Sequence, residues 1–192
     1  MLLFNLQFYG PRIGALYSRS NCPLHPLLFG GGQEKNKRPG TENTVCIAGL
    51  GMAAKLVTQN LDQYIKHFEE LRSYLEQNLL STFGSLVVIH GLNRNDRLPN
   101  TLSVSFTNNE CKGNLILEQA KCVKASTGAA CHSKLANQDG SKVLIASGVD
   151  PNLASCSIRL SIGRTTSRQD ILKVVKALRS ATDVIISKKA AC

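Results

Sequence analysis

The segment 125–133 is the part of this 192-residue sequence best suited to nucleophilic chemistry. Small residues surround Cys131 and leave its sulfur open to approach, and His132 follows it directly. A cationic or hydrogen-bonding neighbour lowers the pKa of a thiol and so increases the fraction of nucleophilic thiolate. The alternative is that Cys131 is a packing residue, because free cysteine is among the most often buried residue types. By itself, the segment favours this second interpretation.

A second segment, residues 28–43, has a composition that suits a bound anion. It contains four glycines, one proline and three cationic side chains, and Thr41 lies just before a predicted helix. Backbone N–H groups, a hydroxyl and a helix N-terminus can together bind a phosphate. The glycine spacing matches neither the Walker nor the Rossmann motif, so a plain connecting loop is the alternative.

A third candidate is Arg159, which lies in a segment that alternates between polar and apolar residues from 157 to 162. In a strand, alternate side chains point to opposite faces, so the apolar residues share one face and Arg159 lies on the other. A guanidinium in that position can bind a carboxylate through two parallel hydrogen bonds, which lysine does less well. An exposed strand arginine without a ligand is the alternative.

Helices and strands must position these residues. Apolar spacing and capping residues predict helices over 44–57, 61–80, 114–120, 142–147 and 167–186, and strands over 1–9, 13–17, 86–90, 101–106, 122–125 and 157–163. Asn60 with Gln63, and Ser167 with Asp170, resemble capping boxes. We expect a mostly antiparallel sheet of three or four strands, covered by the helices at 61–80 and 167–186.

The composition limits the classes of partner and compartment. The sequence has 23 basic and 13 acidic residues, which gives a net charge of +10, but the basic residues are scattered and not interleaved with aromatic residues. A small anionic ligand explains them better than nucleic acid does. The cysteines number seven and lack C-x-x-C spacing, which predicts neither disulfides nor a metal site. No signal peptide or membrane-spanning run is evident, so the sequence predicts a cytoplasmic protein.

Three separated motifs resemble the pyridoxal-phosphate cysteine desulfurase and selenocysteine lyase family, which is of the class V aminotransferase type. The motifs are residues 8–17, residues 30–34 with 38–43, and residues 128–133 with 158–164, in family order along nearly the whole chain. Within the family, Gly-Pro-Arg-Ile-Gly at 10–14 and a histidine directly after the cysteine are more similar to the selenocysteine lyases.

The resemblance implies an α/β fold: the small C-terminal domain of a type I pyridoxal-phosphate-dependent transferase, with a remnant edge of the large domain. Residues 1–43 would be the remnant, with its Gly-rich phosphate loop, and residues 44–192 the small domain. The implied reaction converts L-selenocysteine into L-alanine and reduced selenium in a homodimer, with a selenium-accepting protein as a further partner. Cys131 would receive selenium, Arg159 would bind the substrate carboxylate, and Thr41 would reach across the dimer to the cofactor phosphate.

The sequence departs from the family at one position. Where the family has a His-Lys pair whose lysine binds pyridoxal 5'-phosphate covalently, this sequence has Leu6-Gln7, and the amide of Gln7 cannot make that bond. The chain is therefore expected to be an incomplete form of the lyase without activity of its own. The alternative is a non-catalytic chain that dimerises with full-length subunits or carries selenium or sulfur on Cys131.

Overall fold

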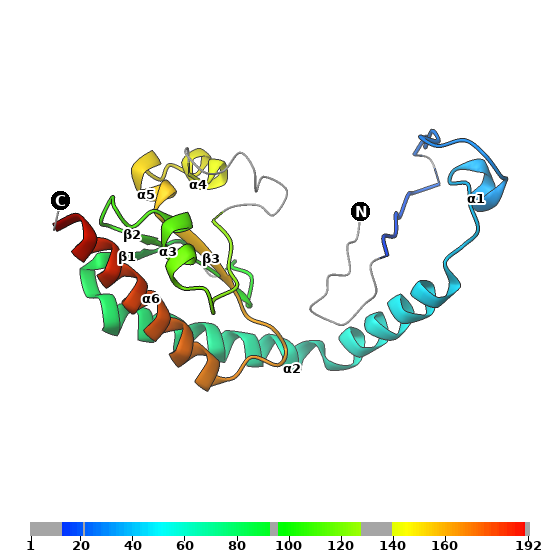
Figure 1. Cartoon of the computed structure of the whole chain (residues 1–192). Coiled ribbons are helices and arrows are strands. Elements are labelled where there is room, and N and C mark those ends of the chain that lie inside the picture. Colours follow the sequence, from blue (N-terminus) through cyan, green and yellow to red (C-terminus); the bar gives the residue numbers. More distant parts are fainter. Residues whose placement is uncertain (1–12, 21, 93–95, 128–139, 191–192) are drawn as a thin grey trace. The chain divides into compact units, whose positions relative to one another are not determined.

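The computed structural model describes residues 13–20, 22–92, 96–127 and 140–190 (Figure 1). The chain divides into two units, Met1–Asp62 and Gln63–Cys192. This division falls within helix α2 (Thr44–Phe83). The predicted domain boundary after residue 43 stays a prediction.

The first unit contains α1 (Gln33–Asn36) and the beginning of α2. Asn43 caps α2, because its Oδ1 accepts a hydrogen bond from the Cys46 N–H at 3.1 Å. Residues 34–36 have positive φ angles of 48°, 56° and 62°, a backbone conformation that residues other than glycine rarely adopt. Among the described residues of this unit only Ala53 is buried, so these residues form no hydrophobic core of their own.

Helix α2 includes both predicted helices, 44–57 and 61–80, which meet at a kink. Asn60 has non-helical backbone angles there, with φ −127° and ψ 17°. Its side chain donates to the Leu56 carbonyl at 2.9 Å, which places it at the end of the first helical part. The predicted capping box was therefore wrong: Asn60 bonds backward along the chain because a free carbonyl is available at the kink.

The second unit is built on a three-stranded antiparallel sheet, as predicted. Its strands are β1 (Val87–Ile89), β2 (Thr101–Phe106) and β3 (Ser157–Ser161), in the order β1-β2-β3. The Gly84–Leu86 turn η2 connects α2 to β1, and Gly84 has a positive φ of 55°. In the register, Ile89 pairs with Val104, and Ser103 pairs with Arg159.

Helices α2 and α6 (Arg168–Ala190) lie along one side of this sheet and enclose the core (Figure 1). The core combines the apolar stripe of α2, the apolar sheet face and the inner face of α6: Phe68, Leu71, Leu75, Leu79, Leu102, Val104, Ile158, Leu160, Ile171, Val175 and Leu178. Ser167 and Asp170 form the predicted capping box, with bonds of 3.0 and 3.2 Å between each backbone N–H and the other side chain. Leu61, the first residue of the predicted helix 61–80, lies outside this core and is 47% exposed.

Three shorter helices complete the second unit: α3 (Gly113–Gln119), α4 (Lys142–Ala146) and α5 (Pro151–Ser155). The sequence predicted α3 and α4 but missed α5, which Asp150 caps and Pro151 begins. Two predicted strands were wrong. Residues 122–125 are not a strand, because the chain reaches β3 only at a single bridge of Ser126, and residues 13–17 contain only one bridge residue, Ala15. The strand predicted at 1–9 lies outside the described residues.

Candidate functional site

Arg159 lies on the sheet face away from the core, as its alternation with apolar residues predicted. Its neighbours in β3, Ile158 and Leu160, are buried, whereas Arg159 is exposed. Within the described part of the chain, its guanidinium has no hydrogen-bond or ion-pair partner. A cation that is not neutralised by the protein is available for an anionic ligand.

The chain segment that leads to Cys131 is joined directly to Arg159. The Ser126 N–H donates to the Arg159 carbonyl at 3.2 Å, and the Arg159 N–H donates to the Ser126 carbonyl at 2.6 Å. These two bonds form the isolated antiparallel bridge beside β3. Ser126 precedes Cys131 by five positions in the sequence. Cys131, His132 and Gln7 themselves lie outside the described residues.

A glycine that sequence reasoning missed, Gly113, packs against Ser157 and Thr127, close in the chain to the bridged residues. A side chain at Gly113 would overlap the Ser157 carbonyl oxygen and would lie 3.0 Å from Thr127 Cγ2. The first turn of α3, strand β3 and the segment after Ser126 are therefore in close contact at Gly113, where only a residue without Cβ fits. A lone glycine before an apolar helix carries no sequence signal for such contact.

His90 occupies the same sheet face, next to β1. The backbone N–H of His90 donates to the Ser103 carbonyl at 2.9 Å, which continues the β1–β2 register by one residue. Its Nε2 lies 2.6 Å from the hydroxyl oxygen of the fully buried Ser105. Burial lowers the pKa of His90, because desolvation disfavours the imidazolium. The pairing gives His90 a structural role between β1 and β2.

Thr41 belongs to the first unit and is exposed, between Gly40 and the Asn43 cap of α2. The preceding loop is closed by a bond from the Gly40 N–H to Gln33 Oε1 at 3.2 Å, and Gly40 has a positive φ of 95°. The described loop also presents three exposed cations, Lys35, Lys37 and Arg38. A hydroxyl beside several cations suits a phosphate group.

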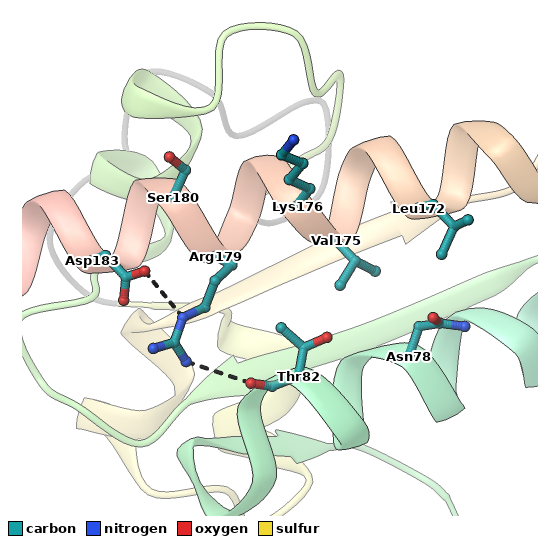
Figure 2. Close-up of a pocket in the computed structure, with 8 residues that line it drawn as sticks. All are labelled: Asn78, Thr82, Leu172, Val175, Lys176, Arg179, Ser180 and Asp183. Atoms are coloured by element: carbon teal, nitrogen blue, oxygen red, sulfur yellow. Dashed lines mark hydrogen bonds and ion pairs between the residues drawn. The ribbon is translucent and has the colours of Figure 1, made fainter.

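A groove of about 450 Å³ lies between α2 and α6, away from the sheet face that carries Arg159 (Figure 2). Figure 2 shows Arg179 in the groove, where Asp183 pairs with it at 3.1 Å and the Thr82 carbonyl accepts from it at 3.4 Å. These partners hold the Arg179 guanidinium within the protein, and Lys176 is a second cation of the groove. The groove includes none of the residues predicted for the site.

Two of the described cysteines are buried and unsuited to nucleophilic chemistry. Burial raises the pKa of both the Cys111 and the Cys156 thiol, because the thiolate loses its hydration. By contrast, Cys22 and Cys122 are exposed. In the part of the chain that is described, no group of three or more His, Cys, Asp or Glu side chains is placed to hold a metal ion, and no helix there has the length and apolarity needed to cross a membrane.

The sequence and the fold of this chain are similar to those of known proteins. The aminotransferase class V family matches residues 7–174. Selenocysteine lyase from Homo sapiens is 49% identical over 182 residues, which are 91% of this chain and 40% of that protein. Selenocysteine lyase from Bos taurus is 46% identical over 91% of this chain and 41% of its own length. Cysteine desulfurase IscS from Dictyoglomus turgidum is 39% identical over 86% of this chain and 41% of its own length.

Among solved structures, the NifS-like protein from Rickettsia africae matches with a TM-score of 0.71 and 32% identity, over 85% of this chain and 41% of that chain. A second NifS-like protein matches with a TM-score of 0.72 and 30% identity, over 88% of this chain and 41% of its own. The predicted fold class is therefore confirmed. The chain spans about two fifths of the length of the relatives it matches.

Proposed function

Because the chain belongs to the aminotransferase class V family, we propose that it forms part of a selenocysteine lyase, which converts L-selenocysteine into L-alanine and reduced selenium. Both selenocysteine lyases and cysteine desulfurases are similar to the chain, and the selenocysteine lyases reported above are the more similar. The resemblance noted in the sequence, with His132 directly after Cys131, also favours the selenocysteine lyases.

The observation that carries this proposal is the double hydrogen bond between Ser126 and Arg159. It connects the start of the Cys131 segment to the backbone of the one strand residue proposed to bind the substrate carboxylate. A substrate held by Arg159 at its carboxylate presents its side-chain selenium a few bonds away from that anchor. A thiolate flanked by small residues can attack that selenium and form a sulfur–selenium bond as the carbon–selenium bond breaks. The electron pair of the broken bond stays with the substrate carbon, which is protonated to give L-alanine, and a thiol reductant then cleaves the sulfur–selenium bond to release selenide.

The cofactor of the proposed reaction is pyridoxal 5'-phosphate, which supplies an electron sink for the bonds at the substrate Cα. The loop around Thr41 fits its phosphate by chemistry: an exposed hydroxyl lies among exposed cations, next to the start of a long helix. Thr41 would bind the phosphate from the opposite subunit of a homodimer. Gln7 does not fit the covalent role of the family lysine, so covalent attachment is not expected at position 7.

A second candidate function is a non-catalytic role, in which the chain associates with full-length subunits or carries selenium or sulfur on Cys131. The exposed surface of the first unit favours association. Its described residues bury only Ala53, while large apolar side chains are exposed: Leu16, Tyr17, Leu27, Leu28, Phe29, Val45, Ile47 and Met52. Apolar surface of this extent is typical of an interface with another polypeptide surface. For the lyase function we also propose a cytoplasmic location and a selenium-accepting protein as a partner.

The proposal is tested in a complete enzyme. Residues 8–192 of this chain would replace the corresponding part of human selenocysteine lyase, so that the remaining part of that protein supplies the large domain and its lysine. With a thiol reductant present, we expect release of selenide from L-selenocysteine, with a higher kcat/KM than for L-cysteine. A chimera that folds and binds the cofactor but does not turn over selenocysteine would contradict the lyase function. Equal or better turnover of cysteine would instead assign a cysteine desulfurase.

A further inference from the structure

The sheet face that carries Arg159 also carries several hydroxyl side chains. Along β2 and β3 they are Thr101, Ser103, Ser105, Ser157 and Ser161. No residue of the described strands β1, β2 and β3 is acidic. A guanidinium among hydroxyl donors, with no carboxylate in the strands to compete for it, favours the binding of an anion.

Most of these hydroxyls are already bonded within the protein. Ser105 bonds to His90 at 2.6 Å, Ser157 to the Ala154 carbonyl at 2.7 Å, and Thr101 to Asn100 Oδ1 at 3.2 Å. In the described part of the second unit, the hydroxyls of Ser103 and Ser161 have no hydrogen-bond partner. These two hydroxyls are therefore available to a ligand.

The ladder geometry distinguishes Ser103 from Ser161. The Phe106 N–H donates to the Cys156 carbonyl, and the Ile162 N–H donates to the Asn100 carbonyl. The residue pairs of β2 and β3 that exchange hydrogen bonds are therefore the even-numbered ones. The Ser103–Arg159 pair lies between them and is a non-hydrogen-bonded pair. In such pairs the side chains approach most closely, with Cα atoms about 4.5 Å apart.

The bonds to Ser126 support this assignment. The N–H and carbonyl of Arg159 both point to Ser126 and so away from β2, as a non-hydrogen-bonded pair requires. Ser161, in contrast, lies two residues along β3 from Arg159, at a distance of about 7 Å along the strand. Of the two available hydroxyls, Ser103 is therefore the one next to the root of the Arg159 side chain.

We infer that Ser103 is a second binding residue for the anion held by Arg159: its hydroxyl donates a hydrogen bond to the carboxylate of the amino-acid substrate. This inference rests on the proposed function. Arg159 supplies the charge and a planar pair of donors, while Ser103 supplies a third donor from the neighbouring strand. Three donors from two adjacent strands fix the rotation of the carboxylate, and with it the direction of the substrate side chain.

The inference is tested by ligand binding to this chain itself, without cofactor or turnover. The ¹⁵N-labelled chain is titrated with L-alanine and, as the control ligand, with L-alaninamide, which lacks the carboxylate. The dissociation constant is obtained from chemical-shift changes of the sheet amides. We expect saturable binding of L-alanine and about tenfold weaker binding by Ser103→Ala, because a hydrogen bond to a charged group is lost. Ser103→Thr, which keeps the hydroxyl, should bind within about threefold of the unmodified chain.

Two further variants separate this inference from the proposed function. Ser161→Ala, which removes the other available hydroxyl, should change the dissociation constant by less than about twofold, and Arg159→Ala should abolish the binding. If Arg159→Ala abolishes binding but Ser103→Ala does not weaken it, the inference is wrong and the role of Arg159 stands. Unchanged binding by both variants contradicts both assignments. Absence of saturable binding to the unmodified chain, or equal binding of L-alaninamide, also overturns the inference.

Discussion

Ser126 and Arg159 exchange two backbone hydrogen bonds, at 3.2 and 2.6 Å, and so form an isolated bridge outside the named strands. The bridge fixes the start of the segment that contains Cys131 beside Arg159. Cys131 follows Ser126 by five positions, and five residues span at most about 18 Å when fully extended. The proposed roles of Cys131 and Arg159 depend on this relationship between Ser126 and Arg159.

Arg159 should contribute to substrate binding in the chimeric enzyme. We expect Arg159→Ala to raise the KM for L-selenocysteine by a factor that corresponds to roughly 2–4 kcal/mol, because a desolvated carboxylate loses its charged partner. Arg159→Lys should recover only part of this loss, since lysine lacks the planar pair of donors. Steady-state kinetics provide the measurement. Arg179→Ala, which removes an arginine from the α2–α6 groove, is the control; equal effects of the two alanine variants would argue against a site at Arg159.

Gly113 should be required for the contact between α3, β3 and the segment after Ser126. In Gly113→Ala the new methyl group meets the Ser157 carbonyl, which is backbone and cannot rotate away. We expect a loss of about 1–3 kcal/mol in the free energy of unfolding, measured by urea denaturation. The control is Gly51→Ala in α2, where nothing lies within 4 Å of the added methyl group. That variant should be neutral or slightly stabilising; a Gly113→Ala protein as stable as the Gly51→Ala protein would be inconsistent with the packing described.

His90 should make the stability of the second unit depend on pH. Because burial lowers its pKa in the folded chain, the unfolded chain binds a proton at His90 more readily. The free energy of unfolding therefore falls as the pH drops below the ordinary histidine pKa of about 6.5. His90→Gln keeps a polar partner for Ser105 but does not titrate, so its stability should fall less between pH 7.5 and 5.5. Urea denaturation at several pH values tests this, and parallel curves for the two proteins would refute it.

The cysteines should differ in reactivity according to their burial. We expect iodoacetamide to label Cys22 and Cys122 readily, and Cys111 and Cys156 at least about tenfold more slowly, because a buried thiol with a raised pKa forms little accessible thiolate. Peptide mass spectrometry of the native chain, with a urea-denatured sample as control, measures these rates. Rapid native labelling of Cys156 would show that the core around it opens more easily than the structure implies.

Much of the second unit followed from sequence periodicity. The apolar stripe of α2, the alternation around Arg159 and the Ser167–Asp170 box each specify one element by local spacing, and each was confirmed. The bridge at Ser126 and the tight contact at Gly113 could not be predicted in this way. They depend on which distant segments meet, and neither a single serine nor a single glycine carries that information.

In the first unit, two predictions from local sequence patterns failed. The strand expected at 13–17 needs neighbouring strands, and in the described chain Ala15 forms only one bridge. At Asn60, a polar residue before an apolar stripe indicates a helix start, yet its side chain bonds backward to Leu56. In neither case did the local pattern determine the partner that completes the element.

The role of Cys131 is the central claim, and one measurement tests it most directly. In the chimeric enzyme, Cys131→Ala should abolish selenide release from L-selenocysteine while leaving the binding of cofactor and substrate unchanged, because only the group that receives selenium is removed. Single-turnover selenide release, measured together with the spectral change on substrate binding, distinguishes these steps. Full selenocysteine turnover by Cys131→Ala would show that the thiol is a packing residue and that the proposed chemistry is wrong.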